Sequence, residues 1–232
     1  MIPLHDTNQR TSFPFINYLI IISNIFVFWL QLTAPNFETF ILTHGFISSR
    51  FSLIDPSTWF QIISSMWMHG GFLHIIFNLW FLHIFGDNVE DRIGHIRYFL
   101  FYVVCGIFAV AAQYLIDPTS SIPLIGASGA IAGVTGAYLY LFKDARIVAL
   151  VPSFFGLMHR VVLPSWIFLG YWFVLQIISG VGSLTSIDVN GGGVAFFAHI
   201  GGFVAGYVLA IFVAPKKAPE EGKYEKLSRL YN

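Results

Sequence analysis

Long runs of apolar residues alternate with short polar stretches along the whole chain. A helix of about 20 apolar residues is long enough to cross the hydrocarbon core of a bilayer. Most of the runs approach or exceed that length, so the pattern predicts six membrane spans joined by polar loops. The predicted spans are 14–33, 72–86, 96–116, 128–142, 161–180 and 192–215.

The segment between the first two spans, residues 34–58, has an intermediate character. It is too polar to cross a bilayer, yet bulky apolar residues such as Phe37, Phe46 and Leu53 recur through it. Segments of this kind lie in the membrane interface. We therefore expect this loop to lie in the interface or to dip partway into the bilayer.

Glycines and polar residues mark the other boundaries. The apolar run 59–86 is interrupted by Met68-His69-Gly70-Gly71, so its helix is predicted to begin at Phe72. Residues 87–94 are polar and end in a helix-breaking glycine, which predicts a connection between spans. Residues 143–160 are interpreted as a semi-apolar link before the fifth span.

Composition supports a membrane protein. The 232 residues are 56% hydrophobic and 10% charged, and the mean hydropathy is +0.72, which is too apolar for a soluble domain. The formal net charge is zero and no basic stretch is interleaved with aromatic residues, so nucleic-acid binding is not expected. A single cysteine, Cys105, excludes an internal disulfide. The predicted fold class is an all-α membrane protein, a bundle of six transmembrane helices with a membrane-dipping loop between spans one and two.

Basic residues indicate the orientation. Six spans place both termini on one side, and the segments on that side carry eleven of the twelve basic residues, whereas the opposite loops carry only Arg50. By the positive-inside rule we expect both termini in the cytoplasm. The chain then divides into a cytoplasmic N-terminal segment (1–13), a six-span domain (14–215) and a basic cytoplasmic tail (216–232).

Ser128 is the first candidate for chemistry. It stands in Gly126-Ala127-Ser128-Gly129, at the start of the fourth span, and a helix N-terminus favours a nucleophilic oxygen and the oxyanion formed after attack. The alternative is a packing face of small residues with Ser128 as its N-cap. A helix over 128–142 extends about 22 Å, less than the hydrocarbon core of about 30 Å, so a submerged, water-filled pocket at Ser128 is predicted.

His199 is the candidate partner of Ser128. The sixth span enters the membrane from the same side as the fourth, and His199 lies about seven residues into it, which puts both side chains at a similar depth. Glycine and alanine faces on the two spans would let their helices approach closely. A lone intramembrane histidine is more often structural, but one level with a glycine-flanked serine is a candidate general base.

His74 and Asn78 lie four residues apart on one face of the second span. Neutral donors of this kind can stabilise an oxyanion, although an interhelical hydrogen-bonded pair is the alternative. All Asp and Glu residues fall outside the predicted spans, so a Ser-His dyad without an acidic partner is expected. No His-Glu-x-x-His motif is present, and neither a metal nor a cofactor is expected.

Together these stretches resemble the rhomboid family of intramembrane serine proteases. The motifs that carry the resemblance are His69-Gly70-Gly71-Phe72-Leu73-His74 with Asn78, Glu90-Asp91-Arg92-Ile93-Gly94, Gly126-Ala127-Ser128-Gly129 and Ala198-His199-Ile200-Gly201-Gly202. The resemblance implies Ser128 as nucleophile, His199 as general base and acid, and His74, Asn78 and the Ser128 backbone N–H as oxyanion hole. It implies a rhomboid-like bundle in which 14–215 is the catalytic domain.

The sequence departs from the family at two points. Some members have Trp-Arg in the loop before span two, where this chain has Trp59-Phe60-Gln61. Some also have a tyrosine four residues after the serine, stacked on the base, whereas this chain has Ala132. Another group must therefore orient His199, and the sequence does not identify it.

The resemblance implies transmembrane proteins as substrates, in a multi-pass protein of a prokaryotic cell membrane. Two other functions stay open: a catalytically inactive member that binds membrane proteins in quality control, and a small transporter, which the lack of membrane carboxylates disfavours. The fifth span is rich in bulky residues such as Trp166, Tyr171 and Trp172. Because bulky faces pack loosely, this span and the loop 180–193 are predicted to form a gate for the substrate, and smaller residues at Trp172 are expected to speed cleavage.

Overall fold

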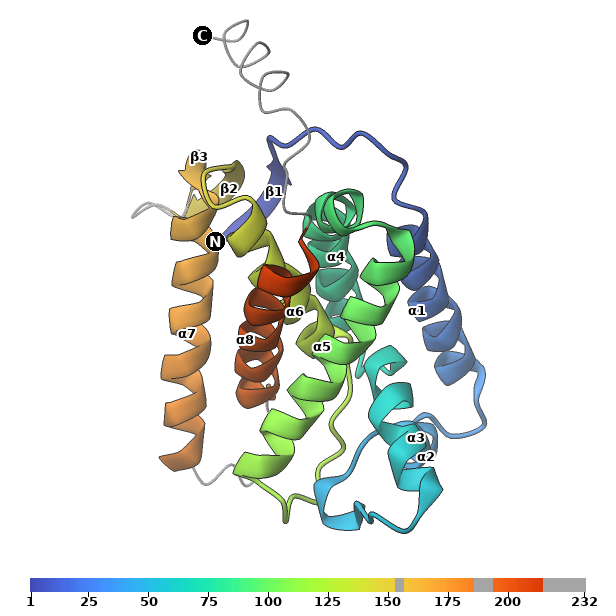
Figure 1. The fold of residues 1–232 in the computed structure, drawn as a ribbon. Helices are drawn as coiled ribbons and strands as arrows, with labels where there is room; N and C mark the ends of the chain where they lie inside the picture. Colours follow the sequence, from blue (N-terminus) through green and yellow to red (C-terminus); the bar gives the residue numbers. More distant parts are fainter. Residues whose placement is uncertain (153–156, 186–193, 215–232) are drawn as a thin grey trace, which may run out of the picture.

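A computed structural model describes residues 1–152, 157–185 and 194–214 of the chain. Within these residues, five helices are long and apolar enough to cross a membrane. They stand side by side as a bundle (Figure 1). The five are α1 (Phe15–Thr33), α4 (Phe72–Ile93), α5 (His95–Ile116), α7 (Ser165–Thr185) and α8 (Phe196–Val213).

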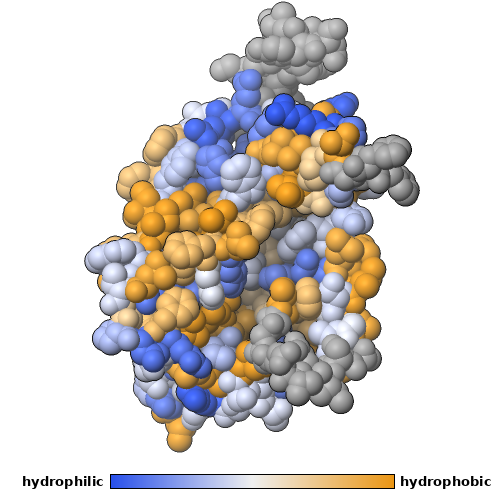
Figure 2. Space-filling view, turned by 180° about the vertical axis from the view of Figure 1, so that it is seen from behind, coloured by the Kyte–Doolittle hydropathy of each residue, from blue (hydrophilic) through white to orange (hydrophobic). Residues whose placement is uncertain are grey.

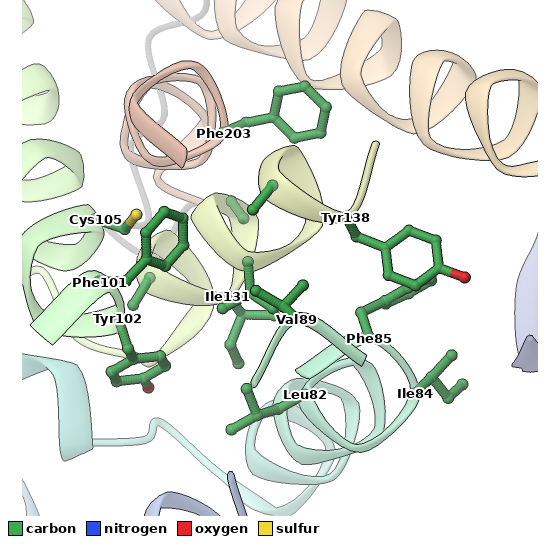
Figure 3. Packing of buried hydrophobic residues seen from close by; sticks show 14 of the residues in the cluster. Leu82, Ile84, Phe85, Val89, Phe101, Tyr102, Cys105, Ile131, Tyr138 and Phe203 are labelled. Carbon is green, nitrogen blue, oxygen red and sulfur yellow. The ribbon is translucent and has the colours of Figure 1, made fainter. Parts of the chain in front are cut away.

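A shorter helix, α6 (Ser128–Leu141, 14 residues), lies in the middle of this bundle (Figure 1). Every residue from Gly129 to Tyr138 is buried. Helix α4 contributes Leu82 and Phe85 to the surrounding core, and α8 contributes Phe203 (Figure 3). The chain is thus built around the helix that begins at Ser128.

Helices α6 and α8 touch through backbone rather than through large side chains. A Cβ atom added at Gly202 would overlap the carbonyl oxygen of Gly129, and one added at Gly206 would overlap that of Gly133. The predicted close approach of the two small-residue faces is therefore confirmed. Only residues without a side chain at these points allow the two helices to come this close.

The segment between α1 and α4 contains helices α2 (Phe37–His44) and α3 (Pro56–Ser64) and two short 3₁₀ turns, Ser48–Arg50 and Ser65–Trp67. Side chains cap both helices: Asn36 accepts from the backbone N–H of Thr39 at 2.7 Å, and Asp55 accepts from that of Ser57 at 2.9 Å.

This segment also braces the loop that precedes α6. Phe46 and Leu124 exchange two backbone hydrogen bonds, of 3.1 and 2.7 Å, as an isolated antiparallel bridge. The N–H of Gly126 donates to the carbonyl oxygen of Ser65 at 2.9 Å. The approach to Ser128 is therefore held by residues that precede α4 in the chain.

The prediction of an all-α protein is wrong at one end of the bundle. Three strands, β1 (Ile2–Asp6), β2 (Arg146–Pro152) and β3 (Met158–Pro164), form an antiparallel sheet in the order β1-β2-β3. The two runs of β2 and β3 are rich in β-branched residues, which favour strands. Ile147 and Ala149 are buried at alternate positions of β2. The predicted semi-apolar link thus contains β2 and the start of β3, and α7 begins at Ser165 rather than at Val161.

Helix α4 extends further than predicted, because residues 87–93 continue the helix instead of forming a connection. Their polar side chains bind the N-terminal segment. Glu90 accepts from the backbone N–H groups of Ile16 (2.9 Å) and Asn17 (2.6 Å), and so caps the start of α1. Asp91 accepts from the backbone N–H groups of Thr11 and Ser12 at 2.9 and 2.8 Å.

The same finding corrects the prediction that every carboxylate lies outside the apolar spans. Asp87, Glu90 and Asp91 belong to α4, and Glu90 is fully buried. Twelve residues separate Asn78 from Glu90, which corresponds to about 18 Å along a helix. These carboxylates therefore lie at the end of α4 away from His74 and Asn78.

Two further boundaries differ from the prediction. Helix α7 runs to Thr185, past the predicted end of the fifth span, and α8 begins at Phe196 rather than at Gly192. His199 is consequently the fourth residue of its helix, not the seventh. The predicted basic tail, 216–232, and most of the predicted loop before the sixth span lie outside the described residues.

Candidate active site

Ser128 is presented by a sharp turn at the N-terminus of α6. Gly126 has φ +120°, a left-handed conformation that glycine adopts readily. A Cβ atom there would lie 2.7 Å from His74 Nε2, so a larger residue would be both strained and obstructed. The first helical hydrogen bond follows directly, from the N–H of Ile131 to the carbonyl oxygen of Ala127 at 3.0 Å. The glycine-flanked serine therefore stands at a helix start, as predicted.

The structure brings Ser128 and His199 together. The distance between Ser128 Oγ and His199 Nε2 is 2.8 Å, which is a hydrogen bond between α6 and α8. Gly129 and Gly202 meet one turn or less from these residues. The close approach of the two backbones thus sets the length of the Ser-His contact.

The other ring nitrogen of His199 has a partner that the sequence analysis missed. His199 Nδ1 lies 2.8 Å from Oε1 of Gln176, a residue of α7. The indole ring of Trp172 lies one turn earlier on α7, with its centroid 6.0 Å from that of the imidazole and the planes tilted by 33°. Two residues of α7 therefore answer the question that Ala132 leaves open: Trp172 packs near the ring of His199, and Gln176 binds its Nδ1 atom.

A sequence signal for Gln176 did exist. Gln176 is a polar residue within an otherwise apolar stretch of α7, and it lies four residues after Trp172, hence on the same face. Periodicity alone could not select its partner, because that choice depends on how α7 is rotated against α8.

His74 and Asn78 face the same region from α4. The N–H of Gly70 donates to His74 Nδ1 at 3.3 Å, so Nδ1 is an acceptor and the ring proton resides on Nε2. That Nε2 atom points toward Gly126, beside Ser128. The amide nitrogen of Asn78 is buried and has no hydrogen-bond partner among the described residues. Both side chains therefore offer an N–H that the described protein groups leave unused.

His69 holds this end of α4 in place. Its backbone exchanges two hydrogen bonds with the side chain of Gln31, a fully buried residue of α1, at 3.0 and 3.1 Å. Its ring packs against that of His74 at a centroid distance of 5.1 Å. A buried amide that satisfies both backbone groups fixes the chain just before the glycines that lead into α4.

One cavity of about 840 Å³ connects the four predicted site residues. Its polar side chains come from Ser128, His199, His74 and Asn78, and also from Ser48, Gln113, Asp117, Ser120 and Thr135. Apolar side chains of α4 and α7, including Phe77, Phe81 and Trp172, line another part of it. The face of the molecule in Figure 2 is hollowed near its middle, with hydrophilic side chains inside the hollow and hydrophobic ones around it.

The titratable groups near the dyad are few. Asp117 lines the cavity, and its Oδ1 accepts from Thr119 at 3.1 Å rather than from His199. In the part of the chain that the structure describes, no cluster of three or more His, Cys, Asp or Glu side chains could hold a metal ion.

Comparison with known proteins decides the family. A model of the rhomboid domain matches residues 56–216, well over half of the chain. The chain belongs to the rhomboid family. This rhomboid is 30% identical to the rhomboid protease GluP of Bacillus subtilis over 213 residues, which cover 90% of the chain but 37% of GluP.

Two other relatives extend the comparison. YdcA of Bacillus subtilis, provisionally named a rhomboid protease, is 25% identical over 193 residues, covering 82% of this rhomboid and 85% of YdcA. RHOMBOID-like protein 5 of Arabidopsis thaliana is 27% identical over 182 residues, covering 72% of this rhomboid and 51% of the plant protein. The described residues include five long apolar helices, and this member of the rhomboid protease family is a multi-pass membrane protein.

Proposed function

We propose that this rhomboid is an intramembrane serine endopeptidase that cleaves transmembrane segments of membrane proteins. The observation that carries the proposal is the 2.8 Å contact between Ser128 Oγ and His199 Nε2 at the wall of the cavity. A hydroxyl hydrogen-bonded to an imidazole nitrogen is the usual arrangement for activating a serine nucleophile. The alternative, an inactive membrane-protein binding factor, gains no support from a site in which both groups are present and hydrogen-bonded.

In the proposed reaction, Ser128 Oγ attacks the carbonyl carbon of the scissile peptide bond while its proton passes to His199 Nε2. The imidazolium then gives this proton to the amine nitrogen as the C–N bond breaks, and an acyl-enzyme ester remains on Ser128. A water molecule, deprotonated by the same nitrogen, hydrolyses the ester and restores the serine. The reaction as proposed uses no cofactor.

Two donors support an oxyanion hole. His74 carries its ring proton on Nε2, and Asn78 has a buried amide nitrogen without a partner among the described residues. A buried donor left unpaired lowers stability, and an oxyanion formed beside it would satisfy it only during the reaction. Donors that gain their partner in the transition state lower the barrier rather than only binding substrate. We assign His74 and Asn78 this role.

The proposed membrane arrangement has six spans, with α6 as the fourth. Its 14 residues extend about 21 Å, less than the hydrocarbon core of about 30 Å, which supports a submerged Ser128. Strand β1 and the C-terminal end of α8 lie at the same end of the bundle (Figure 1), which supports a cytoplasmic location for both termini. Leu53 and Ile54 are highly exposed, which supports contact between the 34–58 segment and lipid.

Cleavage of a reporter in proteoliposomes tests the proposal. Purified protein is mixed with a single-span substrate, and the wild type is compared with Ser128→Ala and with Ser120→Ala, a control serine that also lines the cavity. We expect cleavage by the wild type and by Ser120→Ala, and none by Ser128→Ala. Cleavage by Ser128→Ala would overturn the assignment, and an inactive wild type that still binds the reporter would favour the alternative.

A further inference from the structure

His199 makes two hydrogen bonds, and each uses a different ring nitrogen. Nε2 lies 2.8 Å from Ser128 Oγ, and Nδ1 lies 2.8 Å from Gln176 Oε1. The imidazole is thus held between α6 on one side and α7 on the other. No carboxylate among the described residues contacts it.

The two contacts together define one tautomer. For Nε2 to accept the proton of Ser128, the single proton of a neutral imidazole must reside on Nδ1. That Nδ1–H then needs an acceptor, and the amide oxygen of Gln176 lies at the right distance to be one. With the other tautomer, Nε2 would be a donor and could not take the serine proton. An acceptor at Nδ1 therefore selects the tautomer that a general base requires.

Besides the contact with Ser128, the His199 ring has two contacts with helix α7. Trp172 lies against the imidazole and Gln176 binds its nitrogen, and the spacing of four residues puts them on one face of α7. Helix α7 is also the least buried of the five long helices. The orientation of His199 consequently depends on the long helix that buries the smallest share of its residues.

We propose that Gln176 is a positioning residue, which holds His199 in its base-competent tautomer and so links the reactivity of Ser128 to the position of α7. This inference rests on the proposed function, because it assigns a role within the same dyad. An outward movement of α7 lengthens the Nδ1 contact and leaves the base without its acceptor. The dyad therefore reaches its full reactivity only while α7 is docked on α8.

Three substitutions separate this role from simple packing. Gln176→Leu keeps the size and removes the acceptor; Gln176→Asn keeps the amide but is one methylene shorter; Gln176→Glu keeps an acceptor at full length. We expect kcat to fall about 10-fold to 10²-fold for the Leu and Asn variants, less than the loss of the base itself, with KM nearly unchanged. Gln176→Glu should retain most of the activity and shift the acid limb of the pH profile. Ile177→Ala, on the exposed side of α7, is the matched control.

The second measurement is the rate at which a small fluorophosphonate inactivates each variant. This probe reports the reactivity of Ser128 without a transmembrane substrate, so the Leu and Asn variants should react more slowly in the same proportion as their loss of kcat. Thermal unfolding in detergent checks that each variant folds.

The outcomes of these measurements are distinguishable from those that test the protease assignment. A wild type that neither cleaves nor reacts would defeat the proposed function. An active wild type whose kcat, pH profile and labelling rate are matched by Gln176→Leu would defeat the positioning role alone. A loss that is equal in the Leu and Glu variants would also contradict it, because the acceptor would then not matter.

Discussion

Ser128 Oγ and His199 Nε2 lie within hydrogen-bond distance, 2.8 Å, although 71 residues separate them in the chain. Neither α5 nor α7 intervenes between the two, because α6 and α8 are in direct backbone contact at Gly129 and Gly202. The hydrogen bond is thus a consequence of helix packing by small residues. The length of this hydrogen bond should therefore increase when an added atom moves α6 and α8 apart.

The variant Gly202→Ala tests this dependence. Its Cβ would overlap the carbonyl oxygen of Gly129, so α8 must shift; overpacking of this kind costs about 1–3 kcal/mol of stability. We expect a lower unfolding midpoint and at least a tenfold loss of cleavage. The control is Gly170→Ala on α7, where an added Cβ meets nothing within 4 Å. Equal activity and stability in the two variants would show that the close approach is not needed.

Asn78→Ala should lower kcat by about 10²-fold to 10³-fold while KM changes little, because one oxyanion donor among several is removed. The measurement is steady-state cleavage of a single-span substrate at several concentrations. The loss should be smaller than that of His199→Ala. If KM rose instead and kcat held, Asn78 would contribute to substrate recognition and not to the oxyanion hole.

Five of the predicted spans and the contact between Ser128 and His199 could be predicted from the sequence because both depend on local signals. A run of apolar residues marks a span, and a glycine-flanked serine and a histidine beside Gly201-Gly202 mark two helix faces that can touch. The same reasoning explains why the start of α4 at Phe72 and the extent of α5 agree closely with the prediction.

The features that were missed depend on tertiary partners. The polar composition of residues 87–93 predicts a connection between helices. In the structure, Glu90 of this segment accepts hydrogen bonds from the backbone N–H groups of Ile16 and Asn17. Strand β2 pairs with β3 and with the N-terminal strand β1, and the β-branched residues that favour strands do not specify these partners. Gln176 binds His199 only because α7 presents that one face to α8. Glu90 and Gln176 are both polar residues whose partner belongs to another helix.

The attachment of β1 should depend on pH. Burial raises the pKa of the Asp6 carboxyl to about 6. A hydrogen bond from Tyr138 opposes this shift, and the charge of Asp87 adds to it. In the unfolded chain this pKa is about 3.9. The folded state therefore favours the protonated form of Asp6. The contribution of this preference to the stability of the folded state is complete below about pH 4 and is lost as pH rises through about 6.

Hydrogen exchange measures this effect as the protection factors of the amides in β1 and β2. We expect protection to fall by up to about 10²-fold between pH 4 and pH 7.5 in the wild type. The variant Asp6→Asn should show no such step, because it keeps a polar side chain at this position but cannot ionise. A wild-type step that persists unchanged in Asp6→Asn would mean that another group is responsible.

The gate predicted from the aromatic residues of α7 can be tested with a crosslink to α4. The pair Phe77→Cys and Leu175→Cys, joined by a short bifunctional maleimide, would tether α4 to α7, two of the helices that line the cavity. The native Cys105 is fully buried and should not compete. We expect slower cleavage of transmembrane substrates and unchanged labelling by a small fluorophosphonate. Full cleavage by the crosslinked protein would exclude entry between these helices.

The structure changes one detail of that prediction. Smaller residues at Trp172 were expected to speed cleavage, but the Trp172 ring lies 6.0 Å from that of His199. Its replacement would alter the surroundings of the base as well as the gate. The crosslink separates the two effects, because it leaves Trp172 and Gln176 in place.

The most direct test of the central claim is to find which residue a fluorophosphonate modifies. The purified protein is labelled, digested and mapped by mass spectrometry, alongside Ser128→Ala and His199→Ala. We expect a single adduct on Ser128, absent from Ser128→Ala and formed at least 10²-fold more slowly in His199→Ala. An adduct on Ser120 or another serine, or labelling of Ser128 at the same rate without His199, would contradict it.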